Sequence, residues 1–310
     1  MNPLIFVHIP KTAGTSFRNS VAKIYSDKKF LQDYGQNSPE TTKKVLNEVY
    51  LKNNLYGLLD EQVKVIGGHF LAKKYINISN LKNIVTFLRD PVKRVISEYR
   101  HKQRIEDYQG SILEFAEMPT NRNMMAHYLK TIPIEAVGFI GIAERYEQSL
   151  ELFNKNYGLK VKVQHLNAAL EVKDKHREIY SEELQRIAEF NAIDFAIYNA
   201  SLTNFDWRYR LECKNIAFVH GMWRFDKKHK KVTGYAFSYD CEQPVFLSIS
   251  KKEEVIAEVS ANRFFAIIHR FRGPRRGYVG FSIDVDIDDA TDISCAVTAT
   301  GQPILKMLEC

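Results

Sequence analysis

The sequence predicts an α/β protein in which a three-layer domain with a central parallel sheet is followed by a small antiparallel β-sandwich. Over the first two-thirds of the 310 residues, short apolar runs alternate with long helical stretches, as in a sheet covered by helices on both faces. After Cys213 the chain consists of short runs rich in Val, Ile, Phe and Tyr, separated by turn residues. We therefore expect two domains, residues 1–212 and 213–310.

The first expected strand, residues 4–9, runs into a small polar turn that carries a lysine and opens a helix. Free backbone N–H groups and the positive end of the helix dipole favour an anion at such a point. The turn lacks the Gly-Lys-Ser/Thr of a Walker A loop, which disfavours a metal-dependent kinase. We predict a P-loop-like cradle for a nucleotide-borne phosphate or sulfate, formed by Lys11, Thr12, Ala13, Gly14, Thr15, Ser16 and Phe17.

A second apolar run, residues 83–88, is followed abruptly by a helix whose first residues include an Arg-Asp-Pro triplet. Asp90 is predicted to cap this helix and Pro91 to be its first residue. In that frame Arg89 lies at the strand end beside the helix N-terminus, while Arg94 and Ser97 share one helical face. Because an arginine and a hydroxyl together hold a phosphate well, this segment predicts a second anion site.

Two histidines end expected strands and are candidates for a general base. His69 follows the run 63–68, in which two glycines allow close approach of the backbone. Imidazole has a pKa suited to removing a proton from a hydroxyl near neutral pH. His8 ends the first strand, one turn before Lys11, where its hydrogen bonds would order the cradle.

These segments together resemble the PAPS-dependent carbohydrate sulfotransferases, of the heparan sulfate 2-O and 6-O type in a bacterial form. The string 4–18 is similar to their 5'-phosphosulfate loop, and residues 89–97 are similar to their 3'-phosphate site. Segments 121–129 and 139–147 also follow the family pattern, and their apolar spacing predicts scaffold. The resemblance covers about residues 3–207.

The resemblance implies an enzyme that moves the sulfuryl group of PAPS to a hydroxyl of a carbohydrate, with PAP as product and no metal. The family's Gly-His pair implies that His69 is the general base, with His8 ordering the loop. Lys11 would stabilise the PAP leaving group, and Arg89 and Ser97 would bind the 3'-phosphate. A basic loop that either touches the nucleotide or is simply solvated contains Lys173, Lys175, His176 and Arg177.

Two other classes of protein stay open. A P-loop kinase or nucleotide phosphotransferase would need a magnesium-binding acid on a neighbouring strand and would prefer ATP to PAPS. A non-catalytic glycan-binding protein would use the β domain, with the α/β part as a scaffold. The presence of Lys11, His69, Arg89 and Ser97 argues against such a scaffold. The acceptor is not readable, because acceptor pockets are built from variable loops, here expected at residues 26–62, 70–80 and 101–120.

Composition agrees with a protein that binds anionic ligands. The chain is 45% hydrophobic and 26% charged, with a net charge of +7. Its basic residues are spread along the sequence, which argues against nucleic-acid binding as the main function. No signal sequence and no apolar run near twenty residues is present, so we expect a cytoplasmic protein without a membrane span. The four cysteines have no metal-site spacing and are predicted to be free thiols; a homo-oligomer is possible.

The C-terminal part resembles, more weakly, a small β module of bacterial glycosyl-processing enzymes. Its expected strands are residues 216–220, 232–239, 245–250, 255–259, 278–286 and 294–300. Between two of them lies a segment rich in arginine and aromatic residues. This segment is either a hairpin with a solvated arginine tip or a basic, aromatic surface for an acidic glycan or a second subunit. Its members are Arg263, Phe264, Phe265, Arg270, Phe271, Arg272, Arg275, Arg276 and Tyr278.

Overall fold

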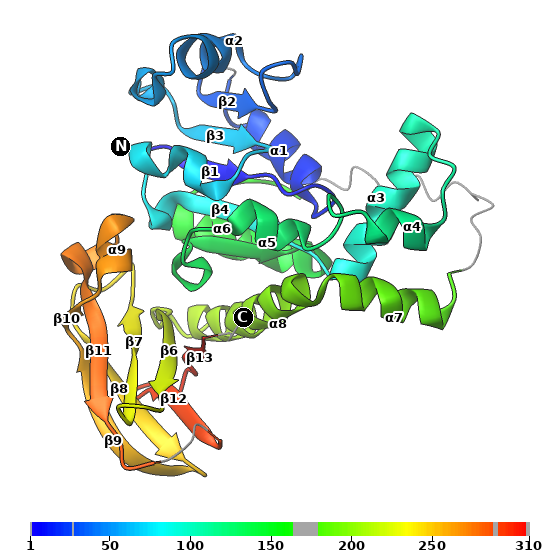
Figure 1. Ribbon diagram of the computed structural model, residues 1–310. Helices are drawn as coiled ribbons and strands as arrows, with labels where there is room; N and C mark the ends of the chain where they lie inside the picture. The colour runs from blue at the N-terminus through cyan, green and yellow to red at the C-terminus, as the bar shows by residue number, and fades with distance from the viewer. Residues whose placement is uncertain (1, 27, 164–178, 288–290, 308–310) are drawn as a thin grey trace. The chain divides into compact units, whose positions relative to one another are not determined.

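The computed structural model describes residues 2–26, 28–163, 179–287 and 291–307 (Figure 1). Its contacts divide the chain into two compact units, and the main division lies within helix α8 (Ala192–Glu212). The basic loop predicted at residues 173–177 lies outside the described residues. The first unit comprises Met1–Ser79, Asn83–Ile132 and Phe139–Phe205, and the second comprises Asn80–Lys82, Pro133–Gly138 and Asp206–Cys310.

The first unit is built on a five-stranded parallel sheet, as the sequence predicts. Its strand order is β2-β3-β1-β4-β5, so the chain crosses from one side of β1 to the other between β3 and β4. In such sheets ligands bind outside the carboxyl ends of the strands, where the order reverses. The strands are β1 (Leu4–Val7), β2 (Phe30–Asp33), β3 (Val65–Gly68), β4 (Ile84–Leu88) and β5 (Phe139–Ile142).

Helices α1 (Gly14–Ala22) and α6 (Tyr146–Tyr157) pack on one face of this sheet through aromatic rings. The Phe17 ring of α1 lies 4.7 Å from that of Phe6 and 5.0 Å from that of Phe87, centroid to centroid. The Phe153 ring of α6 lies 4.9 Å from Phe17 and 5.5 Å from Phe139. Edge-to-face pairs of this kind stabilise a core beyond the area that they bury. This packing fixes the start of α1 against the sheet.

The remaining helical segments of the N-terminal two-thirds are short apart from α3, α7 and α8. Within the described ranges, none is both long and apolar enough to cross a membrane. The α-helices are α1 (Gly14–Ala22), α2 (Lys43–Val45), α3 (Pro91–Glu106), α4 (Ile112–Glu117), α5 (Met124–Leu129), α6 (Tyr146–Tyr157) and α7 (Ser181–Phe190). The π- and 3-10 segments are η1 (Leu46–Leu51), η2 (Leu55–Leu58), η3 (Ala72–Ile78), η4 (Leu81–Asn83), η5 (Ile134–Ala136) and η6 (Ala143–Arg145).

The start of α3 follows the predicted chemistry. The Asp90 carboxylate accepts a hydrogen bond of 2.8 Å from the Lys93 amide, and Pro91 is the first helical residue. An aspartate cap satisfies an amide that the helix itself cannot, and proline there loses no hydrogen bond. The helix therefore begins at once after β4 and leaves Arg89 at the junction.

The second unit contains two β-sheets that share one hydrophobic core. The larger has the order β10-β11-β7-β6-β13 and the smaller has the order β12-β8-β9. All strand pairs are antiparallel except β13 with β6, which run parallel. Trp223 and Phe281 from the larger sheet meet Leu247 and Cys295 from the smaller. The strands are β6 (His220–Asp226), β7 (Lys231–Phe237), β8 (Val245–Lys251), β9 (Glu254–Ala261), β10 (Arg263–Phe264), β11 (Tyr278–Asp284), β12 (Ile293–Val297) and β13 (Leu305–Lys306).

The predicted strand at residues 216–220 is wrong in all but its last residue. The regular strand starts at His220 and continues to Asp226, paired with β7. Val219 is buried, but its amide donates to the Gln302 side-chain oxygen (3.0 Å) and its carbonyl accepts from the Gln302 amide nitrogen (2.6 Å). A single side chain thus satisfies the backbone groups that a neighbouring strand would otherwise have to pair.

The cysteines described by the structure are free thiols, as composition predicts. Cys213 and Cys241 are exposed, whereas Cys295 lies in the core of the second unit. Burial raises the pKa of the Cys295 thiol to about 12. This thiol therefore stays protonated and packs as a small apolar group.

Candidate active site

The residues singled out from the sequence meet at the carboxyl edge of the parallel sheet. His8, His69 and Arg89 are the first residues after β1, β3 and β4. These three strands are neighbours, with Val7 opposite Gly68 on one side and opposite Thr86 on the other. Because parallel strands end at one edge, the three side chains start from adjacent positions.

The turn between β1 and α1 leaves the start of the helix open. Ala13 precedes the helix in a left-handed conformation (φ 69°), and no side chain caps α1. The first turn of α1 also carries no acidic residue. The amides of Gly14, Thr15 and Ser16 have no acceptor within the helix, so they and the helix dipole are available to an anion.

Gly14 is required by a close approach of the His8 ring. A Cβ atom at residue 14 would lie 2.0 Å from Cδ2 and 2.4 Å from Nε2 of His8. Any larger residue would have to displace this ring, which is buried. The glycine thus lets the histidine of β1 lie directly against the first turn of α1.

Not every side chain of the predicted cradle can reach a ligand. The Thr12 hydroxyl donates to the Ile9 carbonyl (2.9 Å) and is buried, and Phe17 belongs to the core. These two residues therefore offer the site only their backbone. Lys11 is half-buried, and burial lowers the pKa of its ammonium group, with Glu98 acting in the opposite direction. A lysine that is partly withdrawn from water is poised to pair with an anion.

Arg89 joins the two predicted anion sites. Its Nη1 atom donates to the carbonyl oxygen of Lys11 (3.2 Å), so the guanidinium lies against the cradle. Ser97 is half-buried, two turns into α3. The structure therefore places Lys11 and Arg89 side by side, with Ser97 on the helix that Arg89 precedes.

Arg94 does not share an open face with Ser97, contrary to the prediction from helical spacing. Its side chain is fully buried, and Nη2 donates to the Asn121 carbonyl (2.8 Å). Its Nε and Nη1 atoms have no hydrogen-bond partner in the described structure. Burial lowers the pKa of this guanidinium, and Asp194 and Glu98 oppose that effect. Arg94 is thus a positioning group that ties α3 to the start of α5.

A backbone carbonyl orients the ring of His69. Its Nδ1 atom lies 2.6 Å from the carbonyl oxygen of His8. Because a carbonyl can only accept, Nδ1 carries the proton and Nε2 keeps its lone pair. Partial burial of the ring is the largest cause that lowers the pKa of His69 from 6.5, and the bond to His8 opposes it. The ring is therefore neutral near pH 7, and the residue is exposed to solvent.

Tyr34, which follows β2, completes an aromatic cluster around the two histidines. Its hydroxyl lies 2.9 Å from Nδ1 of His8, and its ring meets the His69 ring edge-on, with centroids 4.8 Å apart. The two histidine rings are 4.4 Å apart. Arg18 lies over the Tyr34 ring at 5.4 Å. Burial, with His69 and Arg18 adding to it, keeps the pKa of His8 well below 6.5. His8 is therefore a neutral ring between the first turn of α1 and His69, and its side chain is hydrogen-bonded to Tyr34.

A pocket of about 460 Å³ opens beside His69. Part of its lining comes from the loop 70–80, which the sequence assigned to acceptor binding, and part comes from α5. The ring of Tyr128 lies 6.4 Å from that of His69. Its lining residues are His69, Phe70, Leu71, Lys73, Lys74, His127 and Tyr128.

A buried carboxylate behind this pocket escaped the sequence analysis. Asp33 accepts hydrogen bonds from Tyr50 (2.7 Å), Lys74 (2.5 Å) and Tyr75 (2.5 Å). Burial alone would raise the pKa of Asp33, but these donors outweigh it and lower the pKa. Nothing in the sequence signals the cluster, since its members are 17 to 42 residues from Asp33. The cluster fixes Lys74 where it lines the pocket.

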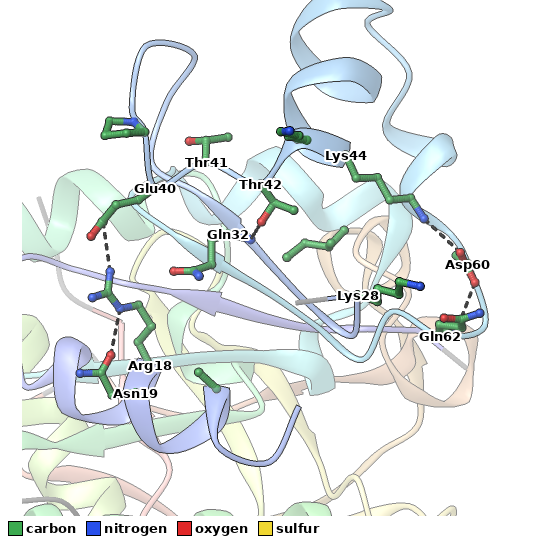
Figure 2. A pocket seen from close by; sticks show the side chains of 14 residues that line it. Arg18, Asn19, Lys28, Gln32, Glu40, Thr41, Thr42, Lys44, Asp60 and Gln62 are labelled. Atoms are coloured by element: carbon green, nitrogen blue, oxygen red, sulfur yellow. Dashed lines mark hydrogen bonds and ion pairs between the residues drawn. The ribbon is translucent and has the colours of Figure 1, made fainter. Parts of the chain in front are cut away.

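A larger cavity of about 850 Å³ lies against α1, β2 and the segment 39–44 (Figure 2). Figure 2 shows Arg18 of α1 extending to Glu40, at 3.1 Å, and Lys44 extending to Asp60, at 3.2 Å. Its lining includes none of the residues predicted for the cradle, the 3'-phosphate site or the general base. Most of its lining falls in the segment 26–62 that the sequence assigned to acceptor binding, and the charges of Arg18 and Glu40 act on the pKa of His69.

Among the described residues, no group of three or more His, Cys, Asp or Glu side chains is arranged to hold a metal ion. In the segment 121–129, Arg122 pairs with Glu117 (3.6 Å) and covers the Phe190 ring at 4.6 Å. His127 instead lines the pocket beside His69. Of the two, only His127 is placed where an acceptor could meet it.

Residues 1–133 match the model of the sulfotransferase family. Both predicted anion sites and His69 lie inside the matched residues, which supports the prediction of a sulfotransferase made from those segments. No curated protein matches the chain in sequence.

Solved structures similar to the chain include three enzymes at low identity. A mouse sulfotransferase complexed with PAP is 12% identical at a TM-score of 0.36, covering 61% of this chain and 62% of that one. A sulfotransferase from Alicyclobacillus acidocaldarius is 15% identical at a TM-score of 0.35, covering 64% and 95%. A retinol dehydratase in complex with androsterone and the inactive cofactor PAP is 14% identical at a TM-score of 0.29, covering 62% and 65%. The chain thus spans less than two-thirds of the mouse enzyme and of the dehydratase.

Proposed function

We propose, on the premise that residues 1–133 match the sulfotransferase family, that this protein is a PAPS-dependent sulfotransferase with a carbohydrate acceptor. One observation carries the proposal: Arg89 donates a hydrogen bond to the Lys11 carbonyl, and at the same edge of the sheet His69 donates from Nδ1 to the His8 carbonyl. Two anion sites and a base thus lie at one edge of the sheet. They suit a nucleotide with phosphates on the 3' and 5' oxygens of its ribose, together with an acceptor whose hydroxyl is deprotonated.

The residues at the start of α1 fit the 5' end of the donor. The amides of Gly14, Thr15 and Ser16 are uncapped, and no acidic residue of the first turn would repel an anion. The half-buried Lys11 adds a charge that gains from pairing. Bound there, PAPS would supply a sulfuryl group already attached to a phosphate leaving group.

Arg89 and Ser97 fit the 3'-phosphate that distinguishes PAP from ADP. The Arg89 guanidinium keeps further N–H donors beyond the one given to Lys11. A forked arginine and a hydroxyl are suited to a dianionic phosphate. These two residues would therefore set the choice of nucleotide.

His69 would remove the proton from the acceptor hydroxyl through Nε2. The hydrogen bond from Nδ1–H to His8 fixes the tautomer and steadies the positive charge that appears on the ring. Lys11 and the α1 amides would stabilise the negative charge that develops on the leaving phosphate. Preorganised donors of this kind are worth roughly a hundredfold to a thousandfold each in rate.

The pocket beside His69 supports a sugar as the acceptor. Its lining includes the aromatic residues Phe70 and Tyr128 and the exposed Lys73, whereas the Lys74 ammonium is already paired with Asp33. Aromatic side chains suit the apolar side of a pyranose, and Lys73 would favour an acidic one. The acceptor loop predicted at residues 70–80 supplies most of this lining.

Calorimetric titration with PAP tests the donor site first. We expect tight binding that needs no magnesium and that ADP does not match. Magnesium-dependent ATP binding with no response to PAP would instead support a kinase. If PAP binds, transfer of labelled sulfate from PAPS should be screened over neutral and acidic oligosaccharides, with a phenol as the non-carbohydrate comparison. Transfer to the phenol alone would refute a carbohydrate acceptor.

A further inference from the structure

The second unit carries an edge that is rich in arginine and has no acidic residue. Residues 261–280 contain five arginines and one histidine but no Asp or Glu. They form β9's last residue, the edge strand β10, the short helix α9 (Ala266–Arg270), the segment η8 (Pro274–Gly277) and the start of β11. The five positive charges are therefore gathered at one edge of the five-stranded sheet.

Most of these arginines are presented to solvent. Arg263, Arg270, Arg272 and Arg276 are exposed, and none of the four has an ion pair within the described part of the chain. The fifth, Arg275, is half-buried and donates to the Ala261 carbonyl (2.7 Å). One arginine thus holds the segment to the sheet, and four remain for a ligand.

Two aromatic rings stand exposed among these charges. Phe264 is 52% and Tyr278 is 53% exposed, and their rings pack edge-to-face with centroids 5.6 Å apart. His269 packs against Phe264 at 5.3 Å. The rings support one another and stay open to solvent, which is an unusual use of large apolar side chains on a protein surface.

The backbone that presents the arginines is in a costly conformation. Arg272, Arg275 and Arg276 have φ values of 54°, 52° and 52°, in the left-handed region. Glycine or asparagine adopts this region more easily than arginine does. The chain keeps arginine at positions where glycine or asparagine would adopt the backbone conformation more easily.

We propose that this edge binds an anionic glycan chain. We name it the arginine–aromatic surface and define it as Arg263, Phe264, Arg270, Arg272, Arg276 and Tyr278. Guanidinium forks pair with sulfate and carboxylate groups, and the paired rings offer a platform for sugar rings. The inference rests on the proposed function for its choice of ligand, because a carbohydrate sulfotransferase releases a sulfated, and therefore anionic, glycan. Binding here would keep the enzyme on the polymer between transfers.

The test measures binding of a heparin oligosaccharide of defined length to the full chain, by calorimetry at several salt concentrations. The first variant is Arg263→Gln with Arg276→Gln, and the second is Phe264→Ala with Tyr278→Ala. The matched control is Lys227→Gln with Lys228→Gln, which removes the same charge from the exposed β6–β7 turn. That turn lies at the far end of β11 from Tyr278, because Asp284 pairs with Lys231. A maltodextrin, phosphatidylserine-containing vesicles and single-stranded DNA serve as comparison ligands.

We expect both surface variants to weaken oligosaccharide binding by about tenfold or more, which corresponds to 1.4 kcal/mol. The lysine control should stay within about twofold, and maltodextrin should not bind. Equal losses in the lysine control would mean non-specific attraction and overturn the proposal. Tighter binding of vesicles or of DNA than of the oligosaccharide would assign the surface to a membrane or to nucleic acid instead.

The PAP titration separates this inference from the proposed function. The surface variants should bind PAP as the unaltered protein does, because the proposed PAP site lies in the first unit and the altered residues in the second. Oligosaccharide binding that depends on the surface in a protein that fails to bind PAP would leave a glycan-binding protein and remove the sulfotransferase. PAP binding without any oligosaccharide binding would keep the enzyme and remove the surface.

Discussion

The Nδ1 atom of His69 lies 2.6 Å from the carbonyl oxygen of His8, the residue that follows the neighbouring strand. A backbone acceptor can fix the tautomer of an imidazole as a carboxylate would, but it adds no negative charge. Burial is the largest cause that lowers the pKa of His69 from 6.5, and the bond to His8 and the carboxylates of Glu40 and Glu98 only oppose it. This arrangement gives a base that is neutral at physiological pH and oriented by the sheet itself.

Replacing His69 by alanine should remove the base and leave the donor site. We expect kcat to fall by about a hundredfold to ten-thousandfold, the usual contribution of a general base, with PAP binding unchanged. Steady-state transfer rates and PAP calorimetry on the same preparation would check both. His229→Ala is the control, because this histidine lies in the exposed β6–β7 turn, bonded to Asp226. Sulfate transfer that survives the loss of His69 would exclude it from the mechanism.

The pH dependence of kcat/KM follows from the direction of the His69 shift. The neutral ring is the active form, and burial lowers the pKa from 6.5, so activity should rise with pH to a plateau with a midpoint below 6.5. The free energy of unfolding changes with pH in the same direction. Because the folded state disfavours the protonated ring, His69 lowers the stability only as the pH falls and the ring takes up a proton. A profile of kcat/KM between pH 4.5 and 8.5 measures the midpoint. A midpoint above 6.5 would contradict this geometry.

Arg89→Ala should weaken PAP much more than adenosine 5'-phosphate, which lacks the 3'-phosphate. The loss of charge-assisted hydrogen bonds predicts a decrease in PAP affinity of about tenfold to a hundredfold. The bond to Lys11 is also lost, and the effect on the monophosphate measures that part. Arg100→Ala, on the exposed side of α3, should change neither. Equal losses for both nucleotides would place the 3'-phosphate away from Arg89.

Gly14→Ala should destabilise the protein, although alanine normally favours a helix by about 1 kcal/mol over glycine. The new methyl group would lie 2.0 Å from Cδ2 of His8, so the ring or the helix start has to move. We expect a loss of about 1–3 kcal/mol in denaturant unfolding, as for other overpacked sites. In a His8→Ala background the ring is absent and the cost of Gly14→Ala should vanish. A cost that persists there would mean that the strain lies in the backbone.

Asp33→Ala should be the most destabilising single change near the pocket. It leaves Lys74, Tyr50 and Tyr75 without their shared acceptor, and breaking a buried pair costs about 3–5 kcal/mol. The lowered pKa of Asp33 means that its stabilisation is full above the ordinary aspartate value and is lost as the pH falls through the folded value. Unfolding midpoints at pH 7 and in acid measure both.

Asp60→Ala is the matched control for Asp33. Asp60 is exposed and pairs with Lys44 at the surface, where solvent screens an ion pair and leaves it a small contribution to stability. The gap between the two variants should close in acid, since Asp33 no longer contributes once it is protonated. Equal losses at pH 7 would show that the buried cluster adds nothing beyond a surface pair.

The sequence predicted the parts of the site that depend on local chemistry. The cap at Asp90, the lysine turn and the histidine after β3 each follow from residues within a few positions of one another. The parallel sheet then brings them to one edge without further information. Arg94 was misplaced because helical spacing gives the face of a residue but not what covers that face. Here the face is buried, and the Arg94 guanidinium donates to the Asn121 carbonyl.

Contacts between distant segments could not be predicted. Tyr34 reaches His8 across 26 positions, and Asp33 gathers donors from three separate segments. The apolar segment 216–220 predicts a strand, yet before His220 no strand forms. The Gln302 side chain bonds the backbone N–H and carbonyl of Val219 in place of a neighbouring strand. In each case the partner is a polar group whose sequence position carries no periodic signal.

The hydrogen bond from Arg89 to the Lys11 carbonyl has a consequence for how a nucleotide is chosen. This hydrogen bond holds the guanidinium against the turn. If the proposed function is correct, the protein itself would set the distance between the 5'- and 3'-phosphate sites. The site would then recognise the separation of the two phosphates as well as their charge. A nucleotide with only one of the two phosphates would bind at one site and lose the contacts at the other. Selectivity would therefore depend on the distance between the phosphates as much as on their charge.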